Sequence, residues 1–410
     1  MGACDDGSSD RTVARAGVTP DEAPNLPDAD AQADAAADAP CGLTINRERE
    51  LLVRALPVVE DPVRTTWNGD PNAPVSGAWH FGKLMTHMAG DNDPAVFVLD
   101  WIDTWQTAQT VNGQTVPARS AITQIIDAWP KLGNGDLDLT QPPMRLLAIV
   151  NRLDLRSDTR AGEGRFVFGV LDGSGNPTQF TVILEYNLPL EVMSAAEWAD
   201  AWHALGADAP ASTAFRNALQ DLTDAFAGPD VLPGQVNGSA ISQVRSNEIH
   251  LSSPWELREF RLNAGGRLRM RTVALTPRVG LNNSTRLADF IDENTEAILA
   301  GTHAVPAIVD GVRFRGGRVT NNIDFWNAPG IADPQARHLF SLNTCNGCHG
   351  AETNTAFLHV NPRSVGQVAS LSGFMTGIDV IDPVDGTTVR SFDDLGRRAA
   401  DLESLLCESL

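Results

Sequence analysis

Residues 164–188, GRFVFGVLDGSGNPTQFTVILEYNL, contain the pattern that decides the fold. Runs of β-branched and aromatic residues at 164–172 and 178–188 are typical of strands. The segment between them, GSGNP, has the composition of a hairpin turn. Two strands joined by so short a turn are antiparallel. The stretch therefore predicts the centre of an antiparallel sheet.

Strand patterns continue on both sides of this hairpin. Further β-branched and aromatic runs lie at 144–155, 242–251, 255–263 and 267–275. The last two are linked by NAGG, which again favours a hairpin turn. Amphipathic helical patterns lie at 46–56, 77–90, 93–107, 120–129, 194–206, 212–228 and 284–301. We predict an α+β fold with a helical N-terminal segment, a mostly antiparallel sheet and a small helical C-terminal region.

Composition divides the 410 residues into three expected parts. Residues 1–40 are rich in Asp, Ala and Pro, so we expect a disordered acidic tether. Residues 41–330 hold the strand patterns and form an α+β domain whose role no motif marks. Residues 331–410 form a C-terminal domain. No apolar run approaches the ~18 residues of a membrane-spanning helix.

The formal net charge of −21 excludes one class of partner. A field of this sign repels phosphate backbones, so we expect no binding to nucleic acid.

The sequence also lacks a GxSxG elbow, an HExxH helix and a phosphate loop. His80 and His87 have no carboxylates at ligand spacing, and Glu248 and His250 need not meet any partner. We therefore expect no catalytic constellation in residues 41–330.

One marked site lies in the run CNGCH near the C-terminus. Two thiols at this spacing can add across the vinyl groups of haem, and the histidine that follows then lies under the iron. Residues 331–410 resemble a c-type cytochrome domain: a helix leads into the motif, Gly350 follows it, and a loop-rich stretch precedes a last helix. The resemblance implies haem c on Cys345 and Cys348, His349 on the iron, and electron transfer.

Other uses of the two cysteines stay open. Structural zinc needs a fourth ligand beside the motif, which His338, His359 or Cys407 could supply. A disulfide between the motif cysteines, or two inert thiols, needs no further partner. A thioredoxin-like redox pair is disfavoured, because its CxxC begins a helix after a strand, whereas this motif follows a predicted helix.

The far side of a haem iron takes a second ligand or stays open. Met375, in SLSGFMTG, lies where c-type cytochrome domains usually place a methionine, and it is the expected ligand. His359, ten positions after His349, is the alternative. Methionine gives a higher potential than a second histidine. An open site would instead admit a small gas or a peroxide.

The remaining cysteines indicate export. GAC followed by small and acidic residues resembles the end of a bacterial lipoprotein signal, which implies a lipid anchor on Cys4. Cys41 and Cys407 flank the expected folded region and can pair in an oxidising compartment, with two buried thiols as the alternative. Covalent haem attachment also occurs outside the bacterial cytoplasm. Both lines of argument therefore require the same compartment.

These features together favour an exported protein of the periplasm or the cell surface, held to a membrane through Cys4. We expect it to transfer single electrons at the cell envelope to a redox partner protein that the sequence does not identify. These features favour an electron carrier over an enzyme and leave the question of enzymatic activity open. The alternative is a non-enzymatic surface lipoprotein, or binding scaffold, whose CxxCH holds zinc or a disulfide. A haem enzyme of the peroxidase type is the weakest interpretation, because one motif binds one haem.

Overall fold

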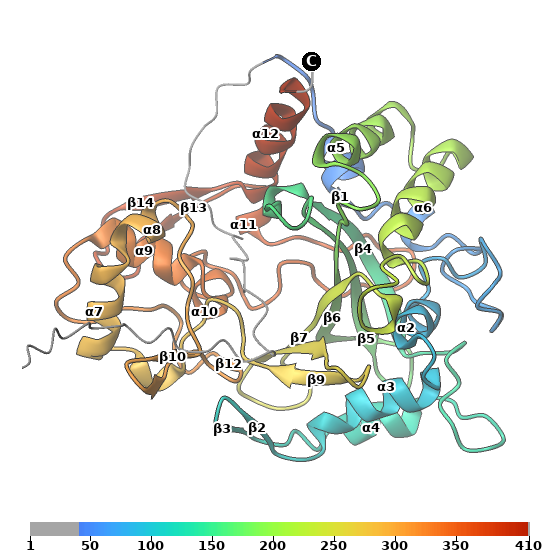
Figure 1. Ribbon diagram of the computed structural model, residues 1–410, viewed down its shortest axis with the longest axis horizontal. Coiled ribbons are helices and arrows are strands. Elements are labelled where there is room, and N and C mark those ends of the chain that lie inside the picture. The colour runs from blue at the N-terminus through green and yellow to red at the C-terminus, as the bar shows by residue number, and fades with distance from the viewer. Residues whose placement is uncertain (1–40, 409–410) are drawn as a thin grey trace, which may run out of the picture.

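An eight-stranded antiparallel sheet forms the centre of the computed structural model, which describes residues 41–408 (Figure 1). The expected anchor Cys4 and the tether at 1–40 lie outside the described residues. The predicted hairpin forms the two middle strands. In the order in which they pair, the strands are β1 (Leu52–Val53), β4 (Met144–Arg152), β5 (Glu163–Leu171), β6 (Pro177–Asn187), β7 (Ile241–Glu248), β8 (Glu256–Leu262) and β12 (Val319–Thr320), and β9 (Leu268–Arg271) also pairs with β8.

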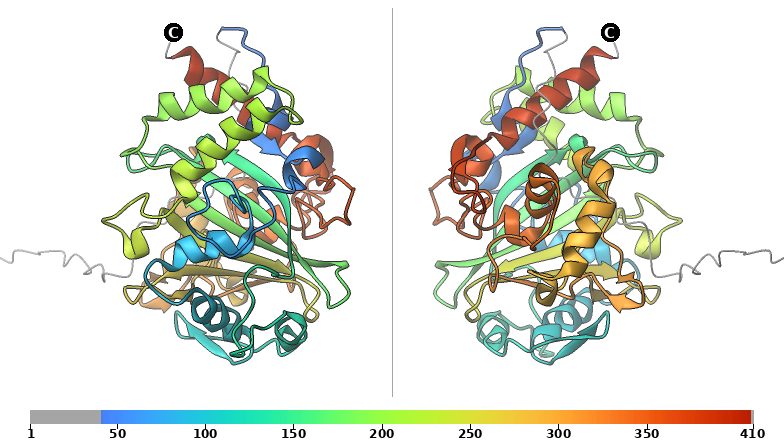
Figure 2. Two further views of the ribbon diagram at one scale, coloured as in Figure 1. Left: turned by 90° about the vertical axis from the view of Figure 1, so that its right-hand side faces the viewer. Right: turned by 90° about the vertical axis from the view of Figure 1, so that its left-hand side faces the viewer.

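Helices and three small hairpins complete this mixed α+β fold. The helices are α1 (Leu56–Val59), α2 (Phe81–Ala89), α3 (Pro94–Ile102), α4 (Ile122–Ala128), α5 (Ala195–Ala204), α6 (Thr213–Ala227), α7 (Thr285–Glu293), α8 (Thr295–Leu299), α9 (Pro334–Leu342), α10 (Cys345–Cys348), α11 (Gly373–Thr376) and α12 (Asp394–Cys407). The hairpins pair β2 (Gln109–Val111) with β3 (Gln114–Val116), β10 (Ile308–Val309) with β11 (Val312–Arg313), and β13 (Ile378–Ile381) with β14 (Val389–Phe392). Figures 1 and 2 show the sheet between α2, α3 and α6 on one side and α7, α9 and α10 on the other.

One face of the sheet is apolar and contributes to the main core. Its row of cross-strand neighbours from β5 to β8 is Phe166, Leu184, Val244 and Phe260. The covering helices supply aromatic partners. The ring centroid of Phe81 in α2 lies 5.3 Å from that of Phe168, and that of Trp101 in α3 lies 5.9 Å from that of Phe260. Burial of large aromatic side chains therefore holds these helices to the sheet.

The opposite face of the sheet carries buried charges, because side chains alternate along each strand. Arg165 stands opposite Glu185 across β5 and β6, and Arg245 stands opposite Glu259 across β7 and β8. All four side chains are buried. Buried ions are costly unless they pair, and here each arginine lies within 3.6 Å of Glu185 Oε1. The segment that contains α9 to α11 covers this charged face (Figure 1).

The core continues from the sheet into the C-terminal segment. One cluster of buried apolar side chains includes Val150 and Val167 of the sheet together with Phe374 and Leu402. Helix α12 packs against α5 and against the π-helical turn η1 (Arg47–Leu51).

The domain boundary expected near residue 330 stays a prediction. Among the described residues, no helix has both the length and the apolar character that a membrane span requires.

Some local expectations are wrong. The stretch 46–56, expected as a helix, forms η1 and then β1, because Leu52 pairs with Val150 at the edge of the sheet. The helix expected at 284–301 breaks into α7 and α8 at Asn294, whose side chain donates to the backbone of the preceding turn. The hairpins β2–β3 and β13–β14 lie in regions expected to contain helices and loops. Tertiary pairing overrides local propensity at these places.

A disulfide joins Cys41 to Cys407 across a sequence separation of 366 residues, as the sequence analysis expected. Closing so long a loop restricts the unfolded chain, so its loss should lower the free energy of unfolding by about 2–5 kcal/mol. Urea unfolding of the wild type and of Cys41→Ser/Cys407→Ser, both without reductant, measures this loss. Reductant should destabilise the wild type and leave the double variant unchanged. Equal stability of the two proteins without reductant would contradict the expectation.

Candidate functional site

The CNGCH motif lies at a tight junction between two helices. Asp333 caps α9, with Pro334 at its first position, as the sequence predicts. Thr344 then caps α10, and its Oγ1 accepts a hydrogen bond from the backbone N of Gly347 at 3.1 Å. A Cβ at Gly347 would collide with the backbone oxygen of Ser341 in α9, so only glycine fits here. The turn of α10 places the two motif cysteines three residues apart on one helical face.

The His349 ring is fixed by the backbone of the loop that follows. Its Nδ1 lies 2.7 Å from the carbonyl oxygen of Phe357. A carbonyl only accepts, so Nδ1 carries a proton, and in the neutral ring Nε2 is the nitrogen that offers a lone pair. The same carbonyl accepts a second hydrogen bond, at 2.8 Å, from Asn247 Nδ2 on β7. This is the arrangement that orients a metal-ligating histidine, with the other ring nitrogen bound to a carbonyl.

Phe357, which supplies that carbonyl, has an unusual backbone conformation. Its φ angle is +65°, a left-handed value that is rare for a bulky side chain. The ring of Trp255 stacks on that of Phe357 at 5.5 Å and lies 5.6 Å from that of His349. Trp255 also donates its Nε1–H to Asn247. Packing against β7 and β8 thus holds a strained residue in the position that orients His349.

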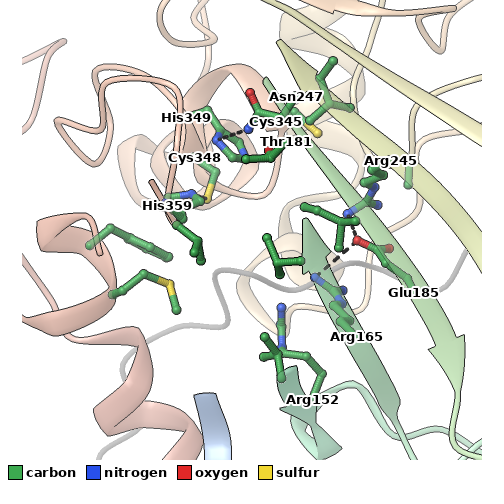
Figure 3. A pocket seen from close by; sticks show the side chains of 18 of the residues that line it. Arg152, Arg165, Thr181, Glu185, Arg245, Asn247, Cys345, Cys348, His349 and His359 are labelled. Atoms are coloured by element: carbon green, nitrogen blue, oxygen red, sulfur yellow. Dashed lines mark hydrogen bonds and ion pairs between the residues drawn. The ribbon is translucent and has the colours of Figure 1, made fainter. Parts of the chain in front are cut away.

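A cavity separates the motif from the charged face of the sheet. The space between its lining residues is about 960 Å³, part of which is open solvent at its mouth. Figure 3 shows the motif on one side of this cavity and Arg165, Glu185 and Arg245 on the strands opposite. The apolar part of its lining is Leu52, Val150, Val167, Ile183, Leu257, Ala274, Leu342, Val360, Phe374 and Met375.

The charged part of the cavity lining is mainly cationic. It consists of four arginines and one carboxylate: Arg152, Arg165, Arg245, Arg398 and Glu185. Each of these arginines also pairs with a carboxylate behind the lining: Arg152 with Asp154, Arg165 with Glu163, Arg245 with Glu259 and Arg398 with Asp394. An anionic ligand would therefore share the guanidinium groups with these carboxylates.

Glu185 is the one carboxylate in this lining, and its side chain is fully buried. Its pKa is raised to about 7, mainly by burial, with a smaller contribution from the carboxylates Glu163 and Glu259. Arg165 opposes this shift, as does Gln243, whose Nε2 donates to Glu185 at 2.6 Å. The group therefore changes its charge near neutral pH.

The structure brings together every motif residue and both expected axial ligands. Cys345, Cys348, His349, His359 and Met375 all line the same cavity. His359 lies beside the motif, with its Nε2 3.3 Å from Cys348 Sγ and its Nδ1 2.9 Å from the hydroxyl of Ser372. Its ring centroid is 4.3 Å from that of His349.

Close sets of metal-ligating atoms lie elsewhere in the part of the chain that the structure describes. One consists of Glu403 and the two cysteines of the disulfide. The other is a buried set of His338, Glu352 and Asp382. Cys407 and His338, both considered as a fourth zinc ligand, therefore belong to other groups. His359 alone of the three candidates contacts the motif.

The buried set at His338 is an ion-pair network. His338 Nδ1 lies 2.7 Å from Glu352, and Arg337 pairs with both Glu352 and Asp382. Arg390 also donates to Asp382, at 3.1 Å. The two guanidinium groups already neutralise both carboxylates and would repel a cation. The network ties α9, the loop after the motif and the β13–β14 hairpin together.

Sequence reasoning missed the sheet side of the cavity. The missed residues are Arg152, Arg165, Glu185, Arg245 and Asn247. A signal was present, because polar residues recur at every second position of otherwise apolar strands, as in QVRSN of β7. Alternation of this kind normally marks a solvent-facing side of a sheet. Comparison with family models, curated proteins and solved structures finds no match to this chain, so its geometry carries the functional argument.

Replacing Arg337 with leucine should destabilise the protein by about 3–5 kcal/mol, because Glu352 and Asp382 would stay buried without their shared cation. Urea unfolding measures this change. The matched control is Arg47→Leu, which removes an ion pair with Asp393 whose side chains are 44% and 40% exposed. That change should cost less than about 1 kcal/mol. A similar decrease in the free energy of unfolding in both variants would show that the buried network stabilises the protein no more than the exposed ion pair does.

Proposed function

We propose that this chain is a c-type cytochrome that binds one haem covalently and transfers single electrons at the bacterial cell envelope. The observation that carries the proposal is the cavity itself. It brings the thiols of Cys345 and Cys348 and the imidazole of His349 against a largely apolar space. A zinc ion or a disulfide at the motif would not fill this cavity.

The donor set and the lining fit a haem. The apolar side chains suit the flat ring, and the four arginines suit its two propionates, which are carboxylates at one edge. Arg165 and Arg245 come from β5 and β7, so the sheet would supply one wall of the haem pocket. The α+β part of the chain then has a role that no motif marks: it surrounds the cofactor.

Each motif residue then has a distinct task. Cys345 and Cys348 would hold the cofactor through thioether bonds, and His349 would offer Nε2 to the iron while the Phe357 carbonyl holds Nδ1. The bound haem supplies a one-electron redox couple. Apolar side chains around it exclude water.

Met375 is the proposed ligand on the far side of the iron. It is buried on α11 and lines the cavity. His359 fits that position less well. Metal–nitrogen bonds of about 2.0–2.1 Å put opposed nitrogens about 4 Å apart, with the ring centres farther out. The ring centroids of His349 and His359 are only 4.3 Å apart, so the two rings stand side by side.

The proposed location at the envelope rests on one observation and on the proposed cofactor. The disulfide between Cys41 and Cys407 suits an oxidising compartment, and a c-type haem would be attached in the same compartment. The sequence at Cys4 adds the proposed lipid anchor. The contact of Cys348 with His359 favours zinc as the second candidate, in a surface lipoprotein that is not a redox carrier.

The absorption spectrum tests the haem directly. We expect protein exported in a host that matures c-type haem to show a sharp reduced α band after extraction of loose haem with denaturant. Cys345→Ser/Cys348→Ser should lose this band, because no thioether bond can form. The matched control is Cys41→Ser/Cys407→Ser, which alters the other cysteine pair and should keep the band. A folded, colourless protein with one zinc ion per chain would establish the second candidate instead.

Substitution of each axial candidate separates them. Met375→Leu nearly conserves volume but removes the sulfur, so we expect it to lower the midpoint potential. His359→Leu should leave the potential close to that of the wild type, because His359 lies beside His349. Both are measured by redox titration of the haem-loaded protein. The opposite result would assign His359 to the iron and leave Met375 as a packing residue.

A further inference from the structure

We propose that Glu185 is the redox-linked proton acceptor of this pocket: its carboxylate takes up one proton when the haem accepts one electron. The proposal rests on the haem assigned above and adds a coupling between electron and proton transfer. It concerns a residue on β6 that is far from the motif in sequence and that lines the same cavity.

The position of Glu185 supports this role. Its side chain is fully buried, yet it lines a cavity with an open mouth through which a proton from solvent can enter. Arg165 Nη1 and Arg245 Nη1 lie 3.5 Å and 3.6 Å from its Oε1, from the strands on either side. Gln243 donates to the other oxygen. These three contacts fix the position of the carboxyl group, and the charges around it influence its protonation.

The charged and titratable groups around Glu185 influence whether its carboxyl is protonated. From the strands that pack beside it these are Arg165 and Glu163 on β5, Arg245 on β7 and Glu259 on β8. Across the cavity lie Arg152, Arg398, His349 and His359. Burial and the two glutamates favour the neutral carboxyl, and the arginines favour the carboxylate. Burial outweighs the opposing cation and raises the pKa of Glu185 to about 7, so a further change of charge in the cavity can shift its protonation.

A haem in the cavity would add such a change. Its propionates would compete with Glu185 for Arg165 and Arg245, and carboxylates that share a site do not all ionise. Reduction then adds one negative charge inside a region of low dielectric, which disfavours the carboxylate further. The balance is one electron from the reductant and one proton from water, giving reduced iron and a neutral Glu185 carboxyl. Oxidation returns both.

The test is the pH dependence of the midpoint potential of the haem-loaded protein between about pH 5 and about pH 9, a window on both sides of neutrality. Uptake of one proton per electron predicts a potential that falls by about 59 mV per pH unit between the pKa values of the oxidised and reduced forms. Glu185→Gln cannot ionise and should give a flat profile. Glu259→Gln, also a buried glutamate of this layer but outside the cavity lining, should keep the slope and move the sloping region to lower pH, because Glu259 raises the pKa of Glu185.

Two further measurements guard against a variant that fails to fold. Gln243→Leu keeps every charge and removes one hydrogen bond to the carboxylate, so it should move the sloping region to higher pH. In the wild type, the infrared difference between reduced and oxidised protein should show a protonated carboxyl appearing on reduction. The same slope in Glu185→Gln, or no carboxyl signal in the wild type, would overturn the proposal. A colourless protein would overturn the haem as well, so the two failures are distinguishable.

Discussion

The rest of the structure depends on how the charged face of the central sheet is paired and covered. Arg165, Glu185, Arg245 and Glu259 lie side by side on four consecutive strands and are all buried. Removing one partner of such a buried pair is costly, because the charge that remains stays buried without its counter-ion. Because one face of the sheet holds these ions and the other holds aromatic side chains, the two faces need different covers. The N-terminal helices cover the apolar face, and the segment with the motif covers the ionic one.

This arrangement explains why a short motif belongs to so large a chain. The His349 ring is oriented by Phe357, which is in turn held by Asn247 on β7 and by Trp255 just before β8. The sheet therefore forms both the support of the motif and the far wall of the cavity. The network of Arg337, Glu352 and Asp382 fixes the motif from the opposite side. In the function we propose, the α+β part is one half of the cofactor pocket.

The same ions give the proposed pocket its chemistry. Arginines in the lining could share their guanidinium groups with an anionic cofactor, and a buried glutamate whose pKa is raised to about 7 can respond to a change of charge nearby. Structural pairing and proton uptake are thus two consequences of one arrangement. A sheet face that were simply apolar could hold a haem ring, but it could neither pair the propionates nor store a proton.

The sequence by itself determined what is local. Strand alternation and turn composition predicted the hairpin of β5 and β6, and Ser194 and Asp333 cap the helices that they were predicted to cap. The spacing of CNGCH identified the site, because three donor groups in five residues need no tertiary structure to be recognised. Only the tertiary structure decided that the charged face of the sheet is buried and that it meets this motif. Those contacts join residues more than a hundred positions apart, and whether an alternating charge faces water or a cavity depends on the segment that covers it.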